Sequence, residues 1–491
     1  MAHDGGKGRF ILFTCAFIAI MNSTTLGYDS SMMNGLQILP AYADYFRLNT
    51  ATTALNVAIV FVGAVIATPF AGTLSNKWGR KCGLVSTSAI AICGGVLQAA
   101  SVHEAMFCIG RLLIGISINT GSVAAPAYLA EVAHPDNREM LVGLWGSAYY
   151  VGSILAAAIT FGSQYLNSTW AWRLPSLLQV LPSVLCILPL AFMPESPRWL
   201  VYQDRHEEAK AMIIKYHGGG NANSPIVAKE YEEIRQTLSH EKATQTVGFK
   251  ALAATKPNRW RLGVVAATAV FCQFSGNNII TYYLGETLST AGITKVQTQL
   301  GINIGISSFS LVTSVLGSIY TARLGRRPSF LISTGLMSMT LLIYAILTKL
   351  YIGRDNSGAS DSLVFLIFLY FGIYSFVWTP LSALYPVEVL TYSTRAHGLA
   401  AYSCIVYLTA FFNTYVIPFA MRINWGFYLI TALWCLVECV VIYFYFPETM
   451  GMSMEEIDGV FGEDMATVLE SVRVDVDVKA YEGKDVTTTP V

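Results

Sequence analysis

Charged side chains are scarce in this chain. Lys, Arg, Asp and Glu make up 13% of its 491 residues, against about 25% in a soluble domain, and the 31 basic and 31 acidic residues cancel. A sparse and balanced charge excludes a nucleic-acid-binding protein, which needs a basic patch. The seven histidines include none at metal-ligand spacing, and no glycine-rich phosphate loop is present. Nothing here indicates an enzyme, a metal centre or a cofactor.

A disulfide framework is also missing. Eight of the nine cysteines fall inside long apolar runs, and only Cys82 falls in a short polar segment. Cysteines in such runs act as small apolar packing residues.

Long apolar runs dominate what is present. The chain is 54% hydrophobic, with a mean hydropathy of +0.49. Runs of about 20 residues, the length that crosses about 30 Å of hydrocarbon, occur twelve times. They are too long and too continuously apolar for barrel strands, so they predict an all-α protein in a lipid bilayer. The predicted spans are 10–35, 53–74, 83–101, 105–129, 141–163, 171–193, 261–288, 299–322, 329–350, 362–386, 397–420 and 425–446.

The two halves of the chain repeat the same polar signature. Tyr128-x-x-Glu131 is followed by Arg138, and Tyr385-x-x-Glu388 is followed by Arg395 at the same spacing. The Gly-Arg pair at Arg80 recurs at Arg326, and the Pro-Glu pair at Glu195 recurs at Glu448. This internal repeat predicts two pseudo-symmetric six-helix bundles. The predicted divisions are an N-terminus at 1–9, bundles at 10–193 and 261–446, a helical linker at 194–260 and a tail at 447–491.

Basic residues in the short loops set the predicted orientation. With the N-terminus inside, ten Lys and Arg fall on the inner side and six on the outer side, which places both termini in the cytoplasm. The polar segment 202–256 has helical charge spacing and predicts short amphipathic helices, divided at Gly218-Gly219-Gly220. The tail predicts a helix over 454–461 and then a polar, disordered end. We expect a monomer in the plasma membrane.

Two ionisable residues lie deep in apolar runs. Asp29 falls near the outer end of the first span, and Arg111 falls about two turns into the fourth from the same side. Such residues are costly in lipid unless they pair or face water, so each is a candidate functional residue. Arg111 would lower the pKa of Asp29, whereas burial without it would raise that pKa. A carboxylate whose partner comes and goes can carry a proton across. The alternative is a static buried ion pair.

The seventh span opens with adjacent amides beside a glycine, followed by two tyrosines. Gln273, Asn277, Asn278, Tyr282 and Tyr283 suit a neutral polyhydroxyl ligand, since amides both donate and accept and aromatic faces cover C–H groups. A helix broken near the midplane is where transporters of this architecture bind substrate. The alternative is hydrogen bonding between helices. Two further candidates for the same site are Trp378 and Asn413.

Repeated charges gather where the inner ends of the helices meet. Pairs among them would join the two halves when the protein opens outward and break when it opens inward. A network is needed, because one exposed pair is worth only about 0–1 kcal/mol. The residues are Arg80, Glu131, Arg138, Glu195, Arg326, Glu388 and Arg395.

Several motifs together resemble a known family. They are Gly27-Tyr28-Asp29, Gly79-Arg80-Lys81, Gly110-Arg111, Pro126-x-Tyr128-x-x-Glu131, Pro194-Glu195-Ser196-Pro197-Arg198-Trp199, Gln273 through Tyr283, Gly325-Arg326-Arg327, Glu388 to Arg395 and Pro447-Glu448-Thr449. On these residues the chain resembles the sugar porter family of the major facilitator superfamily, and its fungal branch of hexose, lactose and cellodextrin transporters. The resemblance implies alternating access, a sugar held between two halves, a proton carrier at Asp29 and its partner at Arg111. It implies proton-coupled import of a mono- or disaccharide.

Four positions depart from the family pattern. The acidic residue after the second span is Asn76, the first glutamine of the seventh span is Cys272, the fifth-span glutamine falls at Gly146, and the tenth-span tryptophan falls at Ala383. A pocket without these side chains suits a disaccharide or a less polar solute. Two alternatives therefore stay open: a passive facilitator for a sugar, polyol or less polar metabolite, and a sugar sensor that transports nothing.

Overall fold

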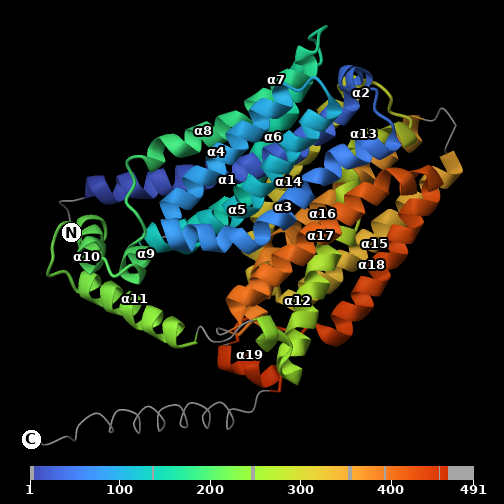
Figure 1. Ribbon diagram of the computed structural model, residues 1–491. Coiled ribbons are helices and arrows are strands. Elements are labelled where there is room, and N and C mark those ends of the chain that lie inside the picture. Colours follow the sequence, from blue (N-terminus) through green and yellow to red (C-terminus); the bar gives the residue numbers. More distant parts are fainter. Residues whose placement is uncertain are drawn as a thin grey trace, which may run out of the picture.

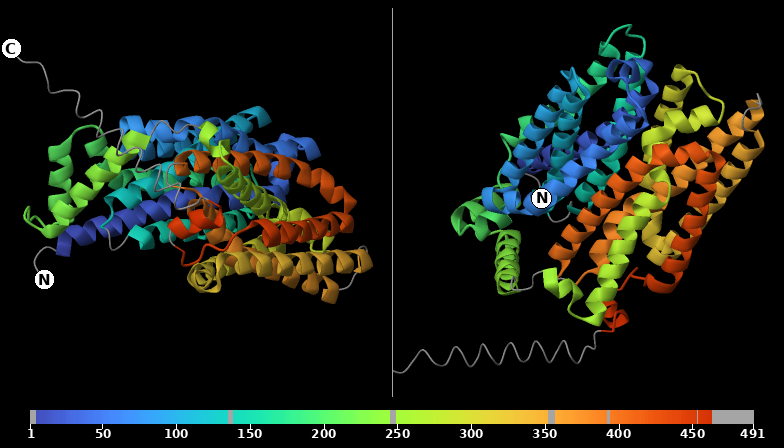
Figure 2. Two further views of the ribbon diagram at one scale, coloured as in Figure 1. Left: turned by 90° about the horizontal axis from the view of Figure 1, so that it is seen from below. Right: turned by 45° about the vertical axis from the view of Figure 1, so that its right-hand side comes forward.

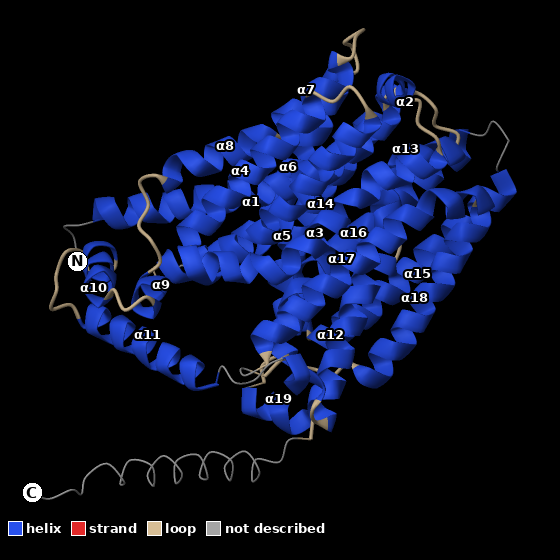
Figure 3. Ribbon diagram, in the orientation of Figure 1, coloured by secondary structure: helices blue, strands red, loops and turns tan. Residues whose placement is uncertain are grey.

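The fold is all-α. The computed structural model describes residues 5–134, 138–244, 249–351, 357–391, 394–452 and 454–462, and in that part of the chain Figure 3 shows helices and loops and no strand. Ten helical segments are long and apolar enough to cross a membrane, and α1 (Gly5–Ile38) and α6 (Arg138–Ser163) complete the twelve predicted spans. The other spans are α3 (Thr50–Trp78), α4 (Arg80–Ala99), α5 (Glu104–Val132), α7 (Trp170–Leu178) with α8 (Val180–Leu190), α12 (Lys256–Phe274) with α13 (Asn277–Thr290), α14 (Val296–Leu324), α15 (Arg326–Tyr351), α16 (Ser357–Val389), α17 (Arg395–Ala420) and α18 (Trp425–Tyr445). The predicted fold class is confirmed.

Most of the helices are longer than the apolar runs that predicted them. The run 53–74, for example, lies within a helix that continues to Trp78, because backbone hydrogen bonding goes on where the apolar side chains stop. Two predicted spans are each broken into two helices. The sixth breaks at Gln179, since Pro182 has no N–H to donate to the carbonyl one turn earlier. The seventh breaks at Ser275 and Gly276, between α12 and α13.

The spans form two bundles that lie side by side (Figure 1). In the N-terminal half, α1 to α8, α1 packs on α6, and α5 packs on α3 and α4. In the C-terminal half, α12 to α18, α12 packs on α17, and α15 packs on α16 and α18. Between the halves, α3 lies against α17, α6 against α14, and α1 against α13 and α14. These six helices make most of the contacts between the halves.

Glycines allow the closest approach inside the N-terminal half. A side chain at Gly27 of α1 would collide with the carbonyl of Tyr149 on α6, and one at Gly152 of α6 would collide with the carbonyl of Thr24 on α1. Small residues that let two backbones touch are the usual packing device of membrane helices. The pair fixes the depth at which α1 sits against α6.

The short helices mark the two ends of the molecule. The helices α9 (Pro197–Tyr202), α10 (His206–Tyr216), α11 (Pro225–Thr244) and α19 (Met454–Val460) lie at one end, here called the linker end, and α2 (Pro40–Phe46) lies at the other, the α2 end (Figures 1 and 2). Short 3-10 helices cover Phe249–Ala253 and Met421–Ile423. The helices predicted in the linker and at 454–461 are confirmed. The predicted disorder after residue 462 falls outside the described residues.

Buried polar contacts attach the linker and the tail to the spans. His217 Nδ1 lies 2.7 Å from Glu230 Oε2, and its Nε2 lies 3.1 Å from the carbonyl of Val132 at the end of α5. Arg261 of α12 donates to Asp458 of α19 at 2.5 Å. Each short helix is thus tied to the half that it follows in the sequence.

Candidate functional site

A buried ion pair joins α1 to α5. Arg111 Nη1 lies 2.5 Å from Asp29 Oδ1, and the two side chains are exposed by 0% and 3%. The other guanidinium donors reach carbonyls of α3, Nε to Asn56 at 3.0 Å and Nη2 to Val57 at 3.2 Å. Arg111 therefore keeps partners whether or not Asp29 is charged. The structure brings the two predicted residues together, and their part in proton coupling stays a prediction.

The neighbour of this pair reaches the other half. The Ser30 hydroxyl lies 3.3 Å from the hydroxyl of Tyr282 on α13. The Tyr282 ring packs edge-on against Phe61 of α3, with centroids 6.0 Å apart. Tyr282 thus lies between the halves, as a ligand of an interface site must. Because Ser30 follows Asp29 in α1, the ion pair and the broken helix are linked through one hydrogen bond.

A row of neutral hydrogen bonds, here called the seam, crosses between the halves. Asn34 of α1 donates to Asn303 Oδ1 at 3.1 Å and accepts from the backbone N–H of Leu284 at 3.2 Å. The other members are Tyr150 with Ser375 at 2.9 Å and with Thr379 at 3.0 Å, and Ser153 with Ser307 at 2.9 Å. Sequence reasoning named Thr379 as a possible part of the sugar site but did not predict these contacts between the halves, although each residue is a polar residue inside an apolar span.

The break between α12 and α13 frees backbone carbonyls, and side chains bond to them. Gly276 has φ 106°, a left-handed conformation that glycine adopts without strain. Tyr374 donates to the carbonyl of Cys272 at 2.9 Å, and Tyr370 donates to that of Ser275 at 2.6 Å. Asn413 donates to the carbonyl of Gln273 at 3.0 Å. Carbonyls freed in a membrane span must be satisfied by neighbouring helices.

The predicted amides cluster at this break. Asn278 Nδ2 lies 3.0 Å from Gln273 Oε1, so two of the amides bond to each other. Asn277 is buried, and no donor in the described residues reaches its Oδ1. An orphan buried acceptor is costly unless a ligand or water donates to it. Among the predicted sugar-binding residues, Asn277 is therefore a strong candidate to accept a hydrogen bond from a bound sugar.

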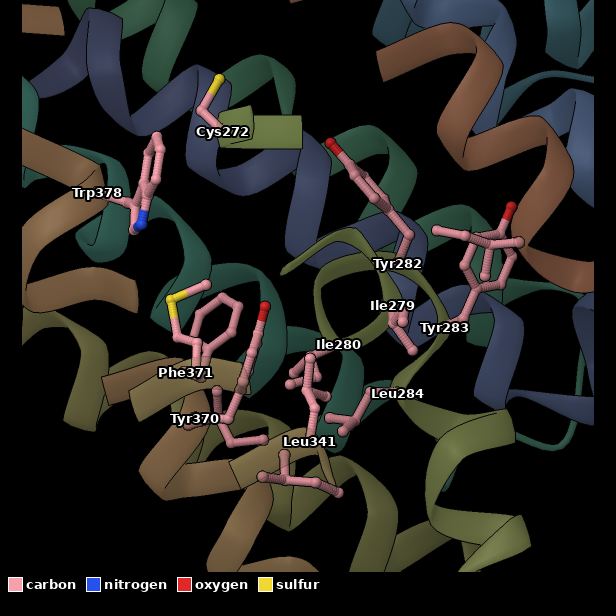
Figure 4. Close-up of a cluster of buried hydrophobic side chains, with 14 of the residues drawn as sticks. Cys272, Ile279, Ile280, Tyr282, Tyr283, Leu284, Leu341, Tyr370, Phe371 and Trp378 are labelled. Atoms are coloured by element: carbon pink, nitrogen blue, oxygen red, sulfur yellow. The ribbon is translucent and has the colours of Figure 1, made fainter. Parts of the chain in front are cut away.

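Two predicted aromatic ligands make their hydrogen bonds within the C-terminal half. Tyr283 donates to the carbonyl of Thr414 at 2.7 Å, and the Trp378 indole donates to Thr334 at 3.2 Å. Both side chains are buried, and Tyr283 also lines a cavity with Gln37 and Tyr42 of the N-terminal half. In Figure 4 the rings of Tyr282 and Tyr283 point apart, and Trp378 lies away from both. In this conformation Tyr283 and Trp378 pack the C-terminal half.

A small cavity lies against the seam. Its volume is about 20 Å³, and its lining includes Asn34, Ser153, Thr281, Asn303 and Ser307. That volume holds about one water molecule, whereas small-molecule pockets measure about 300–1,000 Å³. The halves are therefore closed on each other along the seam.

At the linker end, the N-terminal charges form a network within their own half. Arg80 donates to both carboxylate oxygens of Glu131, at 3.0 and 3.1 Å, and Ser196 donates to the same carboxylate at 2.6 Å. Glu195 accepts from the backbone N–H of Lys81 at 3.2 Å, in the first turn of α4. Burial raises the pKa of Glu195, while backbone donors, Ser196 first, act to lower it. The carboxylate lies where the positive end of the helix dipole favours an anion.

The C-terminal charges repeat that network. Arg326 donates to Glu388 at 2.9 Å, and Thr449 donates to Glu388 at 2.6 Å. Glu448 accepts from the backbone N–H of Arg326 at 2.8 Å, at the start of α15. Gly325 has φ 86°, and a side chain there would meet Glu448 Oε2 at 2.9 Å. The equivalent Gly79, with φ 104°, faces Glu195 in the same way.

The networks lie within the halves, which refines the prediction made from the sequence. The pairs Arg80–Glu131 and Arg326–Glu388 each join residues of one half in this conformation. Pairing between halves in another conformation stays a prediction. Arg395 donates to the carbonyl of Leu390 at 3.3 Å, and Arg138 begins α6 with a side chain outside the described residues.

Three of the positions that depart from the family pattern carry small or neutral residues. Gly146 is exposed, and no atom lies within 4 Å of the place where its side chain would begin. Ala383 is also exposed. Asn76 still reaches Arg80, at 2.5 Å, so a neutral amide stands where the family has an acid. Neither Gly146 nor Ala383 carries the large side chain that the family pattern has at its position.

One buried acid escaped the sequence analysis. Glu438 of α18 is 0% exposed, and its Oε2 lies 3.0 Å from Ser275 Oγ at the helix break. The signal was available, because Glu438 is the one charged residue in the run 425–446. It was overlooked because no basic residue stands at a matching depth to suggest a pair.

Two bundles that enclose a polar seam, with a buried ion pair and a broken helix beside it, define a multi-pass membrane transporter. The chain belongs to the family described as "Sugar (and other) transporter", whose profile matches residues 15–461. Its relatives and structural neighbours are transporters, not enzymes.

Individual relatives cover nearly the whole chain. The MFS-type transporter criB of Aspergillus cristatus is 29% identical over 476 residues, which is 96% of this chain and 98% of that protein. The high-affinity glucose transporter of Kluyveromyces lactis is 27% identical over 470 residues, covering 91% and 84%. Among solved structures, the inward-open xylose transporter XylE from E. coli superposes with a TM-score of 0.76 at 21% identity, covering 91% and 99%. The similarity to the XylE structure supports the fold of two six-helix bundles.

Proposed function

We propose that this protein imports a mono- or disaccharide across the plasma membrane together with a proton, by alternating access, with both termini in the cytoplasm. The observation that carries the proposal is the buried Asp29–Arg111 pair. Ser30, the next residue, contacts Tyr282 of the substrate helix. The acid is therefore one hydrogen bond away from the candidate binding helix. Protonation of Asp29 can change the affinity for sugar, and sugar binding can change the affinity of Asp29 for a proton.

Arg111 allows Asp29 to change its charge without collapse of the site. When Asp29 is ionised, the pair neutralises it; when Asp29 is protonated, the carbonyls of Asn56 and Val57 still hold the guanidinium. About 100 mV supplies roughly 2.3 kcal/mol per proton, and one pH unit adds about 1.4. The sum, roughly 3.7 kcal/mol, sustains a several-hundred-fold gradient of a neutral solute.

The proposed sugar site lies where the broken helix meets the seam. Gln273, Asn277 and Asn278 supply amide donors and acceptors, and Asn277 has an unused acceptor. The small residues Gly146 and Ala383 favour a ligand larger than a hexose, such as a disaccharide. The seam closes the α2 end, so a sugar would leave from the linker end.

The closed seam also suggests how the halves rock. Opening the α2 end would break neutral hydrogen bonds, each worth about 0.5–1.5 kcal/mol net. The charge networks within each half would keep the bundles rigid during that motion. Sugar and proton binding need to supply only a few kcal/mol to shift the balance.

The test uses the full chain in vesicles, with Asp29→Asn. We expect this variant to lose uphill sugar uptake driven by an imposed pH gradient, while exchange of labelled for unlabelled sugar continues. The matched control is Asp44→Asn, an exposed aspartate on α2. Undiminished uphill uptake by Asp29→Asn would remove that residue from the mechanism.

A passive facilitator for a polyol or less polar metabolite is the second candidate. It is favoured by the absent polar side chains at Cys272, Gly146 and Ala383. Exchange without any proton-driven accumulation by the unaltered protein would select it. Signalling without flux would instead select a sensor.

A further inference from the structure

Glu438 is a fully buried acid in the C-terminal half. It projects from α18 toward the end of α12, is 0% exposed, and places Oε2 3.0 Å from Ser275 Oγ. Its other oxygen, Oε1, is buried without a hydrogen-bond partner in the described residues. One turn earlier on the same helix, the buried Trp434 indole N–H approaches Glu438 without a hydrogen bond of normal length.

Among the residues that the structure describes, no basic side chain interacts with Glu438. The titratable groups that interact with it are the thiols of Cys435 and Cys439 on its own helix, Cys272 on α12 and the Tyr370 hydroxyl on α16. None of these is basic. A carboxylate buried among such groups, with one oxygen unbonded, would lack the pairing that a buried charge requires.

The hydrogen bonds of Ser275 indicate whether the Glu438 carboxyl is protonated. A serine hydroxyl has one hydrogen, and Ser275 Oγ makes a very short contact with the carbonyl of Phe271, which can only accept. When that hydrogen points to Phe271, the contact with Glu438 is a hydrogen bond only if Glu438 carries a hydrogen of its own and donates it. Both arguments, the missing cation and the single serine hydrogen, give a protonated Glu438.

Ser275 is part of the break in the substrate helix. It precedes Gly276, and its carbonyl accepts from Tyr370 at 2.6 Å and from the Cys435 thiol at 3.4 Å. A side chain at Gly276 would meet Thr431 at 2.9 Å, so α18 also packs directly on the break. Gln273 and Asn277 stand two residues to either side of Ser275. A shift of Ser275 therefore moves the amides proposed to hold the sugar.

We propose that Glu438 is a second proton-binding residue, distinct from Asp29, which positions the Ser275–Gly276 break and thereby sets the affinity for sugar. Protonated, it holds Ser275. Ionised, it would instead accept the single Ser275 hydrogen, which would then leave the Phe271 carbonyl and shift the break. The part concerning affinity rests on the proposed transport of a sugar, whereas the protonation of Glu438 does not.

The first experiment needs no substrate. Infrared spectra of the full chain in lipid vesicles at neutral pH are compared with those of Glu438→Gln. We expect the wild-type protein to show a protonated-carboxyl C=O band that Glu438→Gln lacks and that Asp44→Asn, altered at an exposed carboxylate, retains. Identical wild-type and Glu438→Gln spectra in this region would show an ionised Glu438 and overturn the proposal.

The second experiment measures the KM and maximal rate of sugar exchange against pH in the Asp29→Asn background, which removes the first proton site. In that parent we expect KM to rise about tenfold toward alkaline pH, with little change in maximal rate, because a lost hydrogen bond to a charged or acidic group has about that effect. Adding Glu438→Gln should keep KM low at every pH, since its amide can donate to Ser275 as the acid does. Adding Glu438→Leu should keep KM high at every pH.

The outcomes separate the two proposals. A Glu438→Gln variant with the parent's pH-dependent KM, or one indistinguishable from Glu438→Leu, would overturn the positioning role. Absence of saturable flux in every protein, wild type included, would overturn the proposed function. The infrared comparison would still decide whether Glu438 holds a proton.

Discussion

The two ends of this molecule are held by different kinds of bond. At the seam, toward the α2 end, neutral side chains of one half bond to the other, as Asn34 does with Asn303. At the linker end, the charged pairs Arg80–Glu131 and Arg326–Glu388 bond within a half. Charge-assisted hydrogen bonds are about twice as strong as neutral ones. The stronger bonds thus lie mostly within the halves and make each half rigid. One of them, from Arg422 to Thr50 at 2.7 Å, joins the halves at the α2 end.

The largest effect is expected where a charged network is broken. Glu131→Gln and Glu388→Gln should each slow sugar exchange about tenfold or more, because each removes a charge-assisted bond worth about 1.5–3 kcal/mol. The two effects should be similar, since the networks have the same geometry. Exchange rates in vesicles measure both.

The matched control for this pair is Glu232→Gln on α11. Glu232 pairs with Arg235 at 3.7 Å, with both side chains well exposed, and such pairs contribute little. An effect of Glu232→Gln equal to that of Glu131→Gln would mean that overall charge at this end, not the network, sets the rate.

A smaller effect is expected from the centre of the seam. Asn34→Leu removes the bonds to Asn303 and to the Leu284 N–H, so the α2 end should open more often, by about 5- to 30-fold for a loss of about 1–2 kcal/mol. Distances between labels at residues 45 and 423, both exposed at that end, report the opening. An unchanged distance distribution would show that packing rather than these bonds closes the end.

The smallest effect is expected from a single hydroxyl pair. Ser153→Ala removes one neutral bond to Ser307, 2.9 Å long, and should shift the same distance distribution about two- to tenfold. Ser308→Ala is the control, because the Ser308 hydroxyl bonds to Ile304 of its own helix at 2.9 Å. Equal shifts from both variants would contradict a special role for the seam.

Sequence patterns predicted the fold and the ion pair well, because both depend on what lipid excludes. Twelve apolar runs imply twelve helices, and Asp29 and Arg111 at matching depth imply a contact. Patterns could not tell which side of a helix faces the interface. The helix α13 is kinked at Tyr283, whose φ of −129° and ψ of 32° are not helical, so Tyr282 reaches Ser30 while Tyr283 reaches Thr414 inside its own half.

The remaining misses have similar causes. The spacing of Glu131 and Arg80 in the sequence places both at the linker end but does not say which half supplies the partner. Glu438 was missed because an acid without a nearby cation matches no expected pair. Its partner is a hydroxyl exposed by a helix break that only the three-dimensional arrangement reveals.

Because each charge network lies within one half, the chain could be divided into two fragments without breaking either network. Glu195 and Ser196 complete the first network and precede α9, while Glu448 and Thr449 complete the second near the C-terminus. A cut between α11 and α12 would therefore leave every member of each network on a single fragment. Two such fragments, produced from separate genes, would each contain a whole charge network, and we expect them to reassociate through the seam and the Arg422–Thr50 contact.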